Sequence, residues 1–496
     1  MTQTDTWLVN NAGGIIHTWN SAYTAGTGIR LLRDGSLVRG IDTGMGFGVG
    51  GVGGGVQRVA YDGTLLWDFR FDGPGYVSHH DVEVLPNGNI LMIVWDEWTL
   101  AEAEAAGRDP TLMDGTLFRP DYVIEVQPTG LTTGTIVWEW HVMDHVIQDF
   151  DGTKANFGVV GDHPELLDLN FPAVIPTEGD WNHMNSVRYY EPRDWIVLSS
   201  REQSEVWIID HSTTTAEAAG HTGGAMGKGG DFLYRWGNPQ SYRAGDETDR
   251  TLWHQHGPMF IPEGYPGAGN IIVFNNLDPS GSAVLEFVPP IDSNGDFVLV
   301  PGSAYGPTGS VWSYQEFAFF SGFVSNAERL PNGNTLICSG VQSHVFEVTP
   351  SGTTVFTFNA GGPIIFHAHY VDSFDCQEVD GGCMGTANPW CSMGIPSGSS
   401  SWTLEAPTFL HSCTGAPVFL IGSEAVSPIS IPSPLGCGVC SLLIDESYGT
   451  FPAPLLIGSG LDPGFEFMAQ AGCIASLGAG MLCVELSAGL RVLVGP

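Results

Sequence analysis

The sequence predicts an all-β protein: a six-bladed β-propeller followed by a small, disulfide-stapled, β-sandwich-like domain. Three observations lead to this prediction. The composition, with 67 glycines, 32 prolines and 11% aromatic residues, suits short strands and tight turns and does not suit helices. Two strand patterns alternate along residues 1–370. Eight of the nine cysteines lie between Cys376 and Cys483, in a compact tail.

The first strand pattern is a glycine turn followed by a strand that ends in aromatic residues. It occurs at 14–19, 63–69, 134–140, 230–236 and 352–358. The second is a hairpin with Asn-Gly or Asp-Gly at its turn, which supplies the positive φ angles that tight hairpins need. It is clearest at 31–38, 82–92 and 327–337. Four-stranded units repeated every roughly 40–70 residues are typical of propeller blades. Pairing the patterns gives six blades, the first and last segments sharing one.

The chain divides by composition into three parts. We expect the propeller at 1–372, a linker rich in Cys, Gly and Ser at 373–401, and the small β domain at 402–496. The propeller rhythm is interrupted at 99–117, where A-E-A-E-A-A predicts a short helix. The even set of cysteines in the tail predicts up to four disulfides in an oxidising compartment. Cys437 and Cys440 form a CxxC without a second ligand pair, which makes zinc the weaker interpretation.

The net charge limits the classes of partner that the protein can bind. A net charge of −37 repels nucleic acid and anionic lipid. No run of about 18 apolar residues is present, so we expect no membrane span. The N-terminus, M-T-Q-T-D-T-W, lacks the basic and apolar regions of a signal peptide. Since the cysteines favour export, we expect a secreted, periplasmic or extracellular protein whose signal segment is not in this chain.

Histidines occupy corresponding places in successive repeats. In a propeller the first strand of each blade lines the central axis, so equivalent positions of different blades converge there. Three first strands begin with histidine and a fourth begins with asparagine, and an arginine ends the strand that follows the second of them. The residues concerned are His79, His80, His183, Asn185, Arg201, His254, His256 and Asn326. We place His367 and His369, at the end of the last blade, outside this predicted site.

These residue types predict a site for an oxyanion. A guanidinium binds sulfate or phosphate through its fork of donors, and imidazoles add further donors. One imidazole can also act as a nucleophile that accepts the group covalently. No P-loop, GxGxxG or GxSxG in a strand–turn–helix setting occurs, so we predict neither a nucleotide nor any other cofactor.

Several longer motifs resemble the bacterial arylsulfate sulfotransferase family. They are H-H-D-V-E-V-L-P-N-G-N, D-W-N-H-M-N-S, L-S-S-R-E-Q-S-E-V-W-I-I-D-H-S-T, Q-H-G, Y-R-W-G-N-P and R-L-P-N-G-N-T-L-I, spread over residues 5–370. The resemblance implies a six-bladed propeller that moves sulfate from a phenolic sulfate ester to another phenol. It implies no nucleotide donor (PAPS), and a ping-pong mechanism through a sulfated histidine.

Carried over by motif, the resemblance assigns roles to individual residues. His256 corresponds to the transiently sulfated nucleophile, and His183 and Arg201 to the groups that bind the sulfuryl oxygens and move protons on the phenol oxygens. His80, or its neighbour His79, supplies a further imidazole.

The remaining assignments are secondary. We expect Asn185 to orient His183, and His254 and Asn326 to be further substrate-binding residues. The family usually has Asp after the nucleophile, and this chain has Gly257.

Two other interpretations use the same residues. One is a catalytically inactive propeller that serves as a binding or structural subunit of an extracellular assembly or filament, with the C-terminal domain mediating contacts or homo-oligomerisation. The other is a zinc or copper site made by His80, His183 and His256. Arg201 argues against the metal site because a guanidinium repels a cation.

Overall fold

The structure, a computed structural model, describes most of the chain up to residue 371. The described residues are 4–371 without 11–12, 33, 48–49, 114, 173–178, 317–318 and 363, followed by the backbone of separate strands from residue 377 on.

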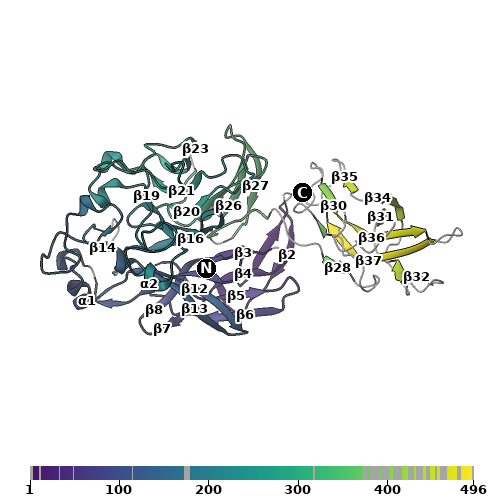
Figure 1. Cartoon of the computed structure of the whole chain (residues 1–496), viewed down its shortest axis with the longest axis horizontal. Helices are drawn as coiled ribbons and strands as arrows, with labels where there is room; N and C mark the ends of the chain where they lie inside the picture. The colour runs from purple at the N-terminus through teal and green to yellow at the C-terminus, as the bar shows by residue number, and fades with distance from the viewer. Residues whose placement is uncertain are drawn as a thin grey trace. The chain divides into compact units, whose positions relative to one another are not determined.

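Five antiparallel sheets of four or five strands make up residues 24–359, and each sheet is one blade of a propeller-like arrangement (Figure 1). The strands of the first two blades are β3 (Thr24–Leu31), β4 (Leu37–Asp42), β5 (Gly54–Val59) and β6 (Leu65–Arg70), then β7 (Asp72–Gly73), β8 (Tyr76–Val84), β9 (Ile90–Asp96), β12 (Asp121–Gly130) and β13 (Thr133–His141). Successive strands of a blade are neighbours in its sheet, which is the topology that hairpin connections produce.

The next three blades follow the same rule with four strands each. Their strands are β16 (Met184–Tyr190), β17 (Trp195–Ser200), β18 (Glu205–Asp210) and β19 (Tyr234–Trp236), then β20 (His256–Phe260), β21 (Ile271–Asp278), β22 (Gly281–Phe287) and β23 (Trp312–Tyr314), then β24 (Asn326–Arg329), β25 (Thr335–Ser339), β26 (His344–Val348) and β27 (Thr354–Asn359). The predicted Asn-Gly hairpins are present as β8–β9 and β24–β25, with Gly88 at φ 86° and Gly333 at φ 87°.

The prediction of an all-β propeller is confirmed, but the predicted number of six blades is wrong. Segment 14–19, which carries the glycine-to-aromatic pattern, is β2 (Ile15–Trp19), and within the described residues β2 pairs only with β1 (Thr6–Val9). The pattern reports a strand with one apolar face, and any such strand shows it. A blade also needs three partner strands in register, and those cannot be read from one strand.

Helices are few and short in the part of the chain that the structure describes. The predicted helix in 99–117 is α1 (Leu100–Ala105), which begins with a capping box between Thr99 and Glu102, and α2 (Thr215–Ala218) has the same cap. None of these helices is long and apolar enough to cross a membrane. The segments between blade strands also contain short paired strands, β10 (Trp98–Thr99) with β11 (Leu117–Phe118) and β14 (Val146–Ile147) with β15 (Leu167–Asp168). The described 3-10 turns are η1 (Pro110–Leu112), η2 (Val142–His145), η3 (Val160–Asp162), η4 (Glu191–Arg193), η5 (Pro239–Tyr242), η6 (Glu247–Asp249) and η7 (Gly340–Gln342).

Contacts within the chain divide it into two units. One comprises Met1–Trp7, His17–Arg30 and Ser36–Tyr370, and the other comprises Leu8–Ile16, Leu31–Gly35 and Val371–Pro496. In the second unit the described strands are β28 (Gln377–Val379), β29 (Trp390–Cys391), β30 (Trp402–Glu405), β31 (Ala416–Gly422), β32 (Ile429–Ile431), β33 (Cys440–Leu442), β34 (Ser447–Pro452), β35 (Leu455–Ile457), β36 (Glu466–Ser476) and β37 (Leu482–Leu493).

The described strands of the C-terminal region form three sheets. Their orders are β28-β37-β36-β31-β34, β29-β30-β35 and β32-β33. The cysteine side chains of this region lie outside the described residues, so the predicted disulfides stay a prediction. The same holds for the boundary at 372 and for the linker at 373–401, most of which lies outside the described residues.

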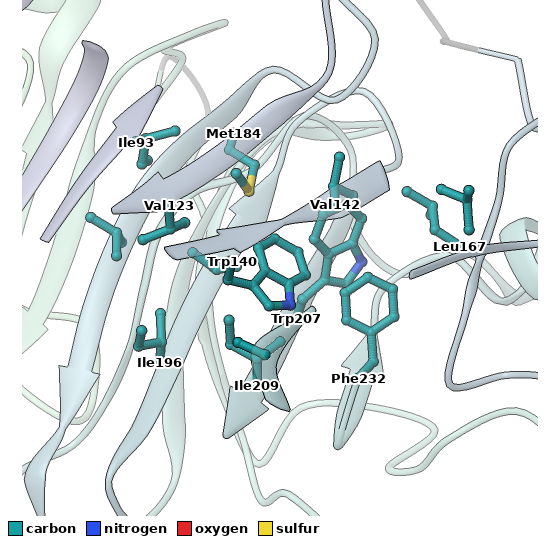
Figure 2. Close-up of a cluster of buried hydrophobic side chains, with 14 of the residues drawn as sticks. Ile93, Val123, Trp140, Val142, Leu167, Met184, Ile196, Trp207, Ile209 and Phe232 are labelled. Atoms are coloured by element: carbon teal, nitrogen blue, oxygen red, sulfur yellow. The ribbon is translucent and has the colours of Figure 1, made fainter. Parts of the chain in front are cut away.

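The blades are held together by apolar side chains between neighbouring sheets. One cluster joins the second and third blades and contains Trp140, Met184, Ile196, Trp207 and Phe232, all fully buried (Figure 2). Further clusters join the third blade to the fourth and the fourth to the fifth. Because each of these clusters takes side chains from two sheets, the second to fifth blades complete their cores only together.

The first strands of neighbouring blades are joined by polar groups. Asp81 in β8 accepts hydrogen bonds from Ser186 Oγ and Val187 N in β16, both at 3.2 Å. Asn185 Nδ2 in β16 donates to the carbonyl of Gln255, next to β20, at 2.8 Å. These buried bonds fix the relative height of the first strands, and so of the histidines within or next to them.

We predict that Trp140→Ala lowers the free energy of unfolding by about 3–5 kcal/mol, because it leaves a cavity between two blades. It also removes the hydrogen bond from Trp140 Nε1 to the Gly230 carbonyl (2.7 Å). Urea unfolding followed by circular dichroism measures the loss. The control is Phe150→Ala, whose ring is 53% exposed and which we expect to cost no more than about 0.5 kcal/mol. Equal losses for the two variants would contradict the inter-blade core.

Candidate functional site

In three blades a histidine in the left-handed backbone region lies within the first strand or one to two residues before it. The φ angles are 54° for His80, 47° for His183 and 54° for His254. Residues other than glycine rarely adopt this conformation, which costs on the order of 1–3 kcal/mol and is concentrated at functional sites. The pairing of β8, β16 and β20 with the next strand is irregular beside these residues. The sheets are therefore distorted at the same level in three blades.

The neighbouring side chains of His79 and His80 make different contacts. The His79 ring stacks on Trp95, with ring centroids 3.7 Å apart, and its Nε2 contacts Asp121 Oδ1 at 3.0 Å. Its Nδ1 lies 2.6 Å from His80 Nδ1. When His79 donates from Nε2 to Asp121, its Nδ1 must accept from His80, which leaves a lone pair on His80 Nε2. The ring of His80 lies edge-on to His183, with centroids 4.6 Å apart. His80 is thus the axial imidazole, and His79 supports it.

His183 is oriented by a carboxylate. Its Nδ1 contacts Asp180 Oδ2, and Asp180 Oδ1 accepts from Trp95 Nε1 at 3.1 Å. Burial lowers the pKa of His183, but the charge and hydrogen bond of Asp180 outweigh burial and raise this pKa above its usual value. The expectation that Asn185 orients His183 is wrong, because Asn185 Nδ2 donates to Gln255 O and its Oδ1 has no hydrogen bond.

His256 lies fully enclosed by hydrogen-bonding groups. Its Nδ1 is 2.7 Å from Asn276 Oδ1 and 3.2 Å from the His254 carbonyl oxygen, and its Nε2 accepts from Val324 N at 3.2 Å. Burial, only partly opposed by the bond to Asn276, lowers the pKa of His256 to about 3. The ring is therefore neutral at pH 7.

Gly257 follows His256 with φ 61°. A Cβ at this position would lie 2.8 Å from Asn326 Cβ and 3.2 Å from Asn326 Cα. Both the backbone angle and the lack of space explain why glycine stands where the related family has Asp.

Arg201 brings a positive charge to the axis. Its Nη1 contacts Glu202 Oε1, and its charge helps to lower the pKa of His80, His254 and His256. Burial, followed by Arg201, lowers the pKa of His254 to about 3. The Nδ1 of His254 is buried without a hydrogen bond and lies 3.9 Å from Glu202 Oε1.

Asn326 begins the first strand of the fifth blade, as predicted, but its amide is already engaged. Its Nδ2 donates to the Ala368 carbonyl at 2.9 Å and its Oδ1 accepts from Ala368 N at 3.0 Å. It thus ties β24 to the segment that follows β27. A direct contact between Asn326 and substrate stays a prediction.

The segment after β27 supplies a histidine that sequence reasoning placed outside the site. His367 is buried, neither of its ring nitrogens has a hydrogen bond, and its Nδ1 lies 3.9 Å from Asp81 Oδ1. Burial lowers the pKa of His367 well below its usual value, and His256 and His80 contribute to this shift. The neighbouring Phe366 ring faces both of those imidazoles at centroid distances of 6.0–6.2 Å. His367 therefore belongs to the axial cluster.

The arrangement suits the binding of an oxyanion. The positive charge of Arg201 acts on three buried imidazoles with lowered pKa values, those of His80, His254 and His256. Several polar atoms of the site lack partners: His254 Nδ1, Asn185 Oδ1 and both nitrogens of His367. Buried polar groups without partners cost about 1–3 kcal/mol each unless a ligand or water satisfies them. An anion placed near Arg201 would satisfy the donors, and His183 is the imidazole best able to carry a proton.

Possible metal ligands lie close together at a different place from the metal site predicted from the sequence. Within the described residues, one group has ligand atoms close enough to share an ion: His145, His221 and Asp231, within 4.8 Å of one another. They already bond to each other, since the Nδ1 of each histidine is 2.8 Å from Asp231 Oδ1, and His145 Nε2 contacts the Ala218 carbonyl. His80, His183 and His256 do not form such a group among the described residues.

Sequence reasoning missed the groups that hold the histidines. Asp180 could have been found, because it stands three residues before His183 inside the same motif. Asn276 left a weaker signal, a polar residue at the end of the apolar run I-I-V-F. His367 gave none beyond its place after the last blade, because only the closure of the ring brings it to the axis.

Comparisons with known proteins agree with the motifs. The family model described as Arylsulfotransferase (ASST) matches residues 2–362. No curated protein matches the chain.

Similar solved structures include a protein of unknown function from Bacteroides caccae (11% identity, 74% of this chain and 94% of that chain, TM-score 0.40). They also include virginiamycin B lyase from Staphylococcus aureus (9% identity, 74% and 80%, TM-score 0.32) and a periplasmic gluconolactonase from Pseudomonas aeruginosa (13% identity, 71% and 74%, TM-score 0.35). Likenesses this remote carry no argument about the chemistry of this chain.

We predict that burial of neutral His256 makes folding weaker in acid. Its pKa is about 3 in the folded chain, against an ordinary histidine value of 6.5, so between these pH values the unfolded chain binds a proton that the folded chain does not. The contribution of neutral His256 to the free energy of unfolding is therefore fully present above pH 6.5. Below pH 6.5 this contribution decreases by about 1.4 kcal/mol for each pH unit. Urea unfolding of wild type and His256→Asn between pH 4.5 and 7.5 measures the difference. A difference that does not change with pH would contradict the burial of a neutral imidazole.

We predict that Gly257→Asp destabilises the fold and does not raise any activity. The substitution combines the cost of a side chain at positive φ with a collision at Asn326, about 1–3 kcal/mol or more. Thermal unfolding measures the loss. Gly264→Asp is the control, because Gly264 also has positive φ but has open space around it. A Gly257→Asp chain as stable as this control would show that the space beside Asn326 is not limiting.

Proposed function

The chain belongs to the arylsulfotransferase family, and from this membership and the axial site we propose that it transfers a sulfuryl group from a phenolic sulfate ester to a phenol by way of a sulfated His256. The single observation that supports this mechanism best is the state of His256. Its Nδ1 faces two acceptors and its Nε2 accepts a hydrogen bond, so a lone pair is present at Nε2. A neutral imidazole with such a lone pair is a nucleophile at neutral pH.

In the first step we propose that Val324 N–H releases Nε2 of His256, whose freed lone pair then attacks the sulfur of the donor. The new N–S bond forms as the bond between sulfur and the phenolic oxygen breaks, and the phenolic oxygen leaves with the electron pair. His183, whose raised pKa favours the protonated ring, supplies the proton that converts the phenolate to phenol. The products of this step are a phenol and the N-sulfo form of His256.

The second step reverses the first with a different phenol. Neutral His183 takes the proton from the acceptor hydroxyl, whose oxygen attacks the sulfur. The N–S bond breaks, and its electron pair returns to Nε2 of His256. One enzyme form reacts with the donor and the other with the acceptor, which gives ping-pong kinetics.

Arg201 has the electrostatic role in this proposal. Its guanidinium balances the negative charge on the sulfuryl oxygens, which remains throughout the transfer, and buried donors fixed before the reaction do this most effectively. His80, supported by His79, adds a second imidazole on the side of His183. His254 offers its unpaired Nδ1 to the oxygens of the substrate, and the unpaired Oδ1 of Asn185 can accept a hydrogen bond from the hydroxyl of the acceptor phenol.

The cellular setting is part of the same proposal. We propose that the protein is secreted or periplasmic, supported by the cysteine-rich C-terminal region and the acidic composition. Assembly through that region, as a homo-oligomer or with extracellular partners, is a proposal of the same standing.

We expect the wild-type protein to release 4-nitrophenol from 4-nitrophenyl sulfate, and to do so faster when a second phenol is added. His256→Ala should remove turnover because no covalent intermediate can form. Arg201→Ala should lower kcat/KM by about 10²–10³-fold, the usual effect of losing one preorganised charge-stabilising group. Absorbance of the released 4-nitrophenol measures all three.

The control for this assay is His141→Ala, which removes a partly exposed histidine outside the site. It should keep wild-type turnover. A folded wild-type protein that turns over none of several aryl sulfates would reject the enzyme and favour the inactive propeller that acts as a binding or structural subunit.

A further inference from the structure

His256 has a defined tautomer that several contacts impose together. The His254 carbonyl oxygen can only accept a hydrogen bond, so Nδ1 must carry the proton. The Val324 N–H can only donate, so Nε2 must carry the lone pair. The shortest of the contacts, 2.7 Å, joins Nδ1 to Asn276 Oδ1.

The orientation of the Asn276 amide is fixed as well. Asn276 lies in β21 and is fully buried. Its Nδ2 donates to two carbonyl oxygens, that of Ser321 at 2.7 Å and that of Val324 at 2.8 Å. Because neither carbonyl can donate, the amide cannot be turned around, and its oxygen must face His256. A buried amide with all these bonds satisfied is rigid.

We propose that Asn276 is a positioning residue for the sulfuryl transfer, which holds His256 in the tautomer that presents its lone pair at Nε2. The effect of Asn276 on the rate of transfer rests on the proposed function, but the tautomer of His256 is a property of the folded chain itself. Through its Nδ2, Asn276 also anchors the carbonyl of Val324. One amide thereby sets both the imidazole ring and the backbone residue that faces Nε2.

The chemistry explains why this partner is an amide. As the N–S bond forms at Nε2, the lone pair becomes a bond and the ring gains positive charge, while Nδ1 keeps its proton. The bond from Nδ1–H to Asn276 Oδ1 therefore strengthens in the transition state, which is how a partner accelerates a reaction. A carboxylate at the same place would favour the protonated ring before the reaction and remove the lone pair at neutral pH. An amide orients the ring without this charge.

The structure offers a matched control one residue away. Asn275 is also fully buried in β21, but the hydrogen bonds of its side chain go to the backbone of Trp253 and Thr251 and to Asp278 Oδ2, away from His256. Asn275→Ala and Asn276→Ala therefore remove the same group from the same strand at equal burial. A general weakening of β21 would affect both variants alike.

The first experiment reads the tautomer directly, by ¹⁵N nuclear magnetic resonance of histidine-labelled full-length protein without any substrate. The His256 signal is assigned as the one that is missing in His256→Ala. We expect Nδ1 to be protonated in wild type and in Asn275→Ala. In Asn276→Ala we expect partial deprotonation, because the shortest bond to Nδ1 and the bond that holds the Val324 backbone are both lost, and only the 3.2 Å contact with the His254 carbonyl oxygen remains at Nδ1. An unchanged His256 tautomer in folded Asn276→Ala would overturn the proposal. This result does not depend on activity, so an inactive wild-type protein would reject the proposed function and leave this test valid.

The second experiment uses 4-nitrophenyl sulfate and separates positioning from general stability. We expect Asn276→Ala to lower kcat by about 10–100-fold, by analogy with the loss of a hydrogen-bond partner that orients a metal-binding histidine. KM and the kcat of Asn275→Ala should change less than about twofold. Equal losses of kcat in the two alanine variants would overturn the proposal.

Asn276→Asp gives the pH signature. The carboxylate keeps an acceptor for Nδ1–H but raises the pKa of His256, so Nε2 is protonated below that raised pKa and free above it. Activity should therefore be lost at pH 5–6, where wild type stays active, and approach wild type near pH 9 more closely than Asn276→Ala does. A pH–rate profile for Asn276→Asp with the shape of the wild-type profile would count against the proposal.

Discussion

The molecule depends on a buried carboxylate, that of Asp81, at the point where the first strands of the blades meet. It binds Ser186 and Val187 of the third blade, the Arg188 guanidinium, and, at 3.6 Å, Arg30 of the first blade. Burial raises the pKa of Asp81 to about 6, against the attraction of Arg30. Since an uncompensated buried charge costs several kcal/mol, these strands are stable only when the blades are assembled together. Arg30 Nη1 also contacts His369 Nε2 at 3.0 Å, which links the first blade to the end of the last.

The candidate site is built onto this polar axis and shares its residues. His80 immediately precedes Asp81, and the contacts that hold Asp81 also hold the left-handed turn at His80. Between the blades the contacts are apolar and tightly packed, whereas along the axis they are polar and hydrogen-bonded. The apolar layer provides the stability that allows three histidines to remain in unfavourable backbone conformations. A site of this kind belongs to the ring of blades and to no single blade.

The two central imidazoles differ because of the group behind each ring. His183 has the carboxylate of Asp180, which raises its pKa, and His256 has the amide of Asn276, which leaves the pKa low. One ring is thereby disposed to hold a proton and the other to present a lone pair. Environments that push the pKa values of neighbouring titratable groups apart are how proteins assign acid and nucleophile roles to similar side chains.

The sequence by itself determined the fold class, the hairpins at 82–92 and 327–337 and the histidines that lead the first strands, because periodicity, Asn-Gly turns and repeated motifs are local properties of the chain. It could not give the number of blades, since the strand at 14–19 carries the blade pattern without the partner strands. It also could not give the roles of Asn276 and His367, or separate His79 from His80. Those depend on which groups meet across blades that are distant in sequence, and only the tertiary structure decides how a buried ring is bonded and which of its nitrogens keeps the proton.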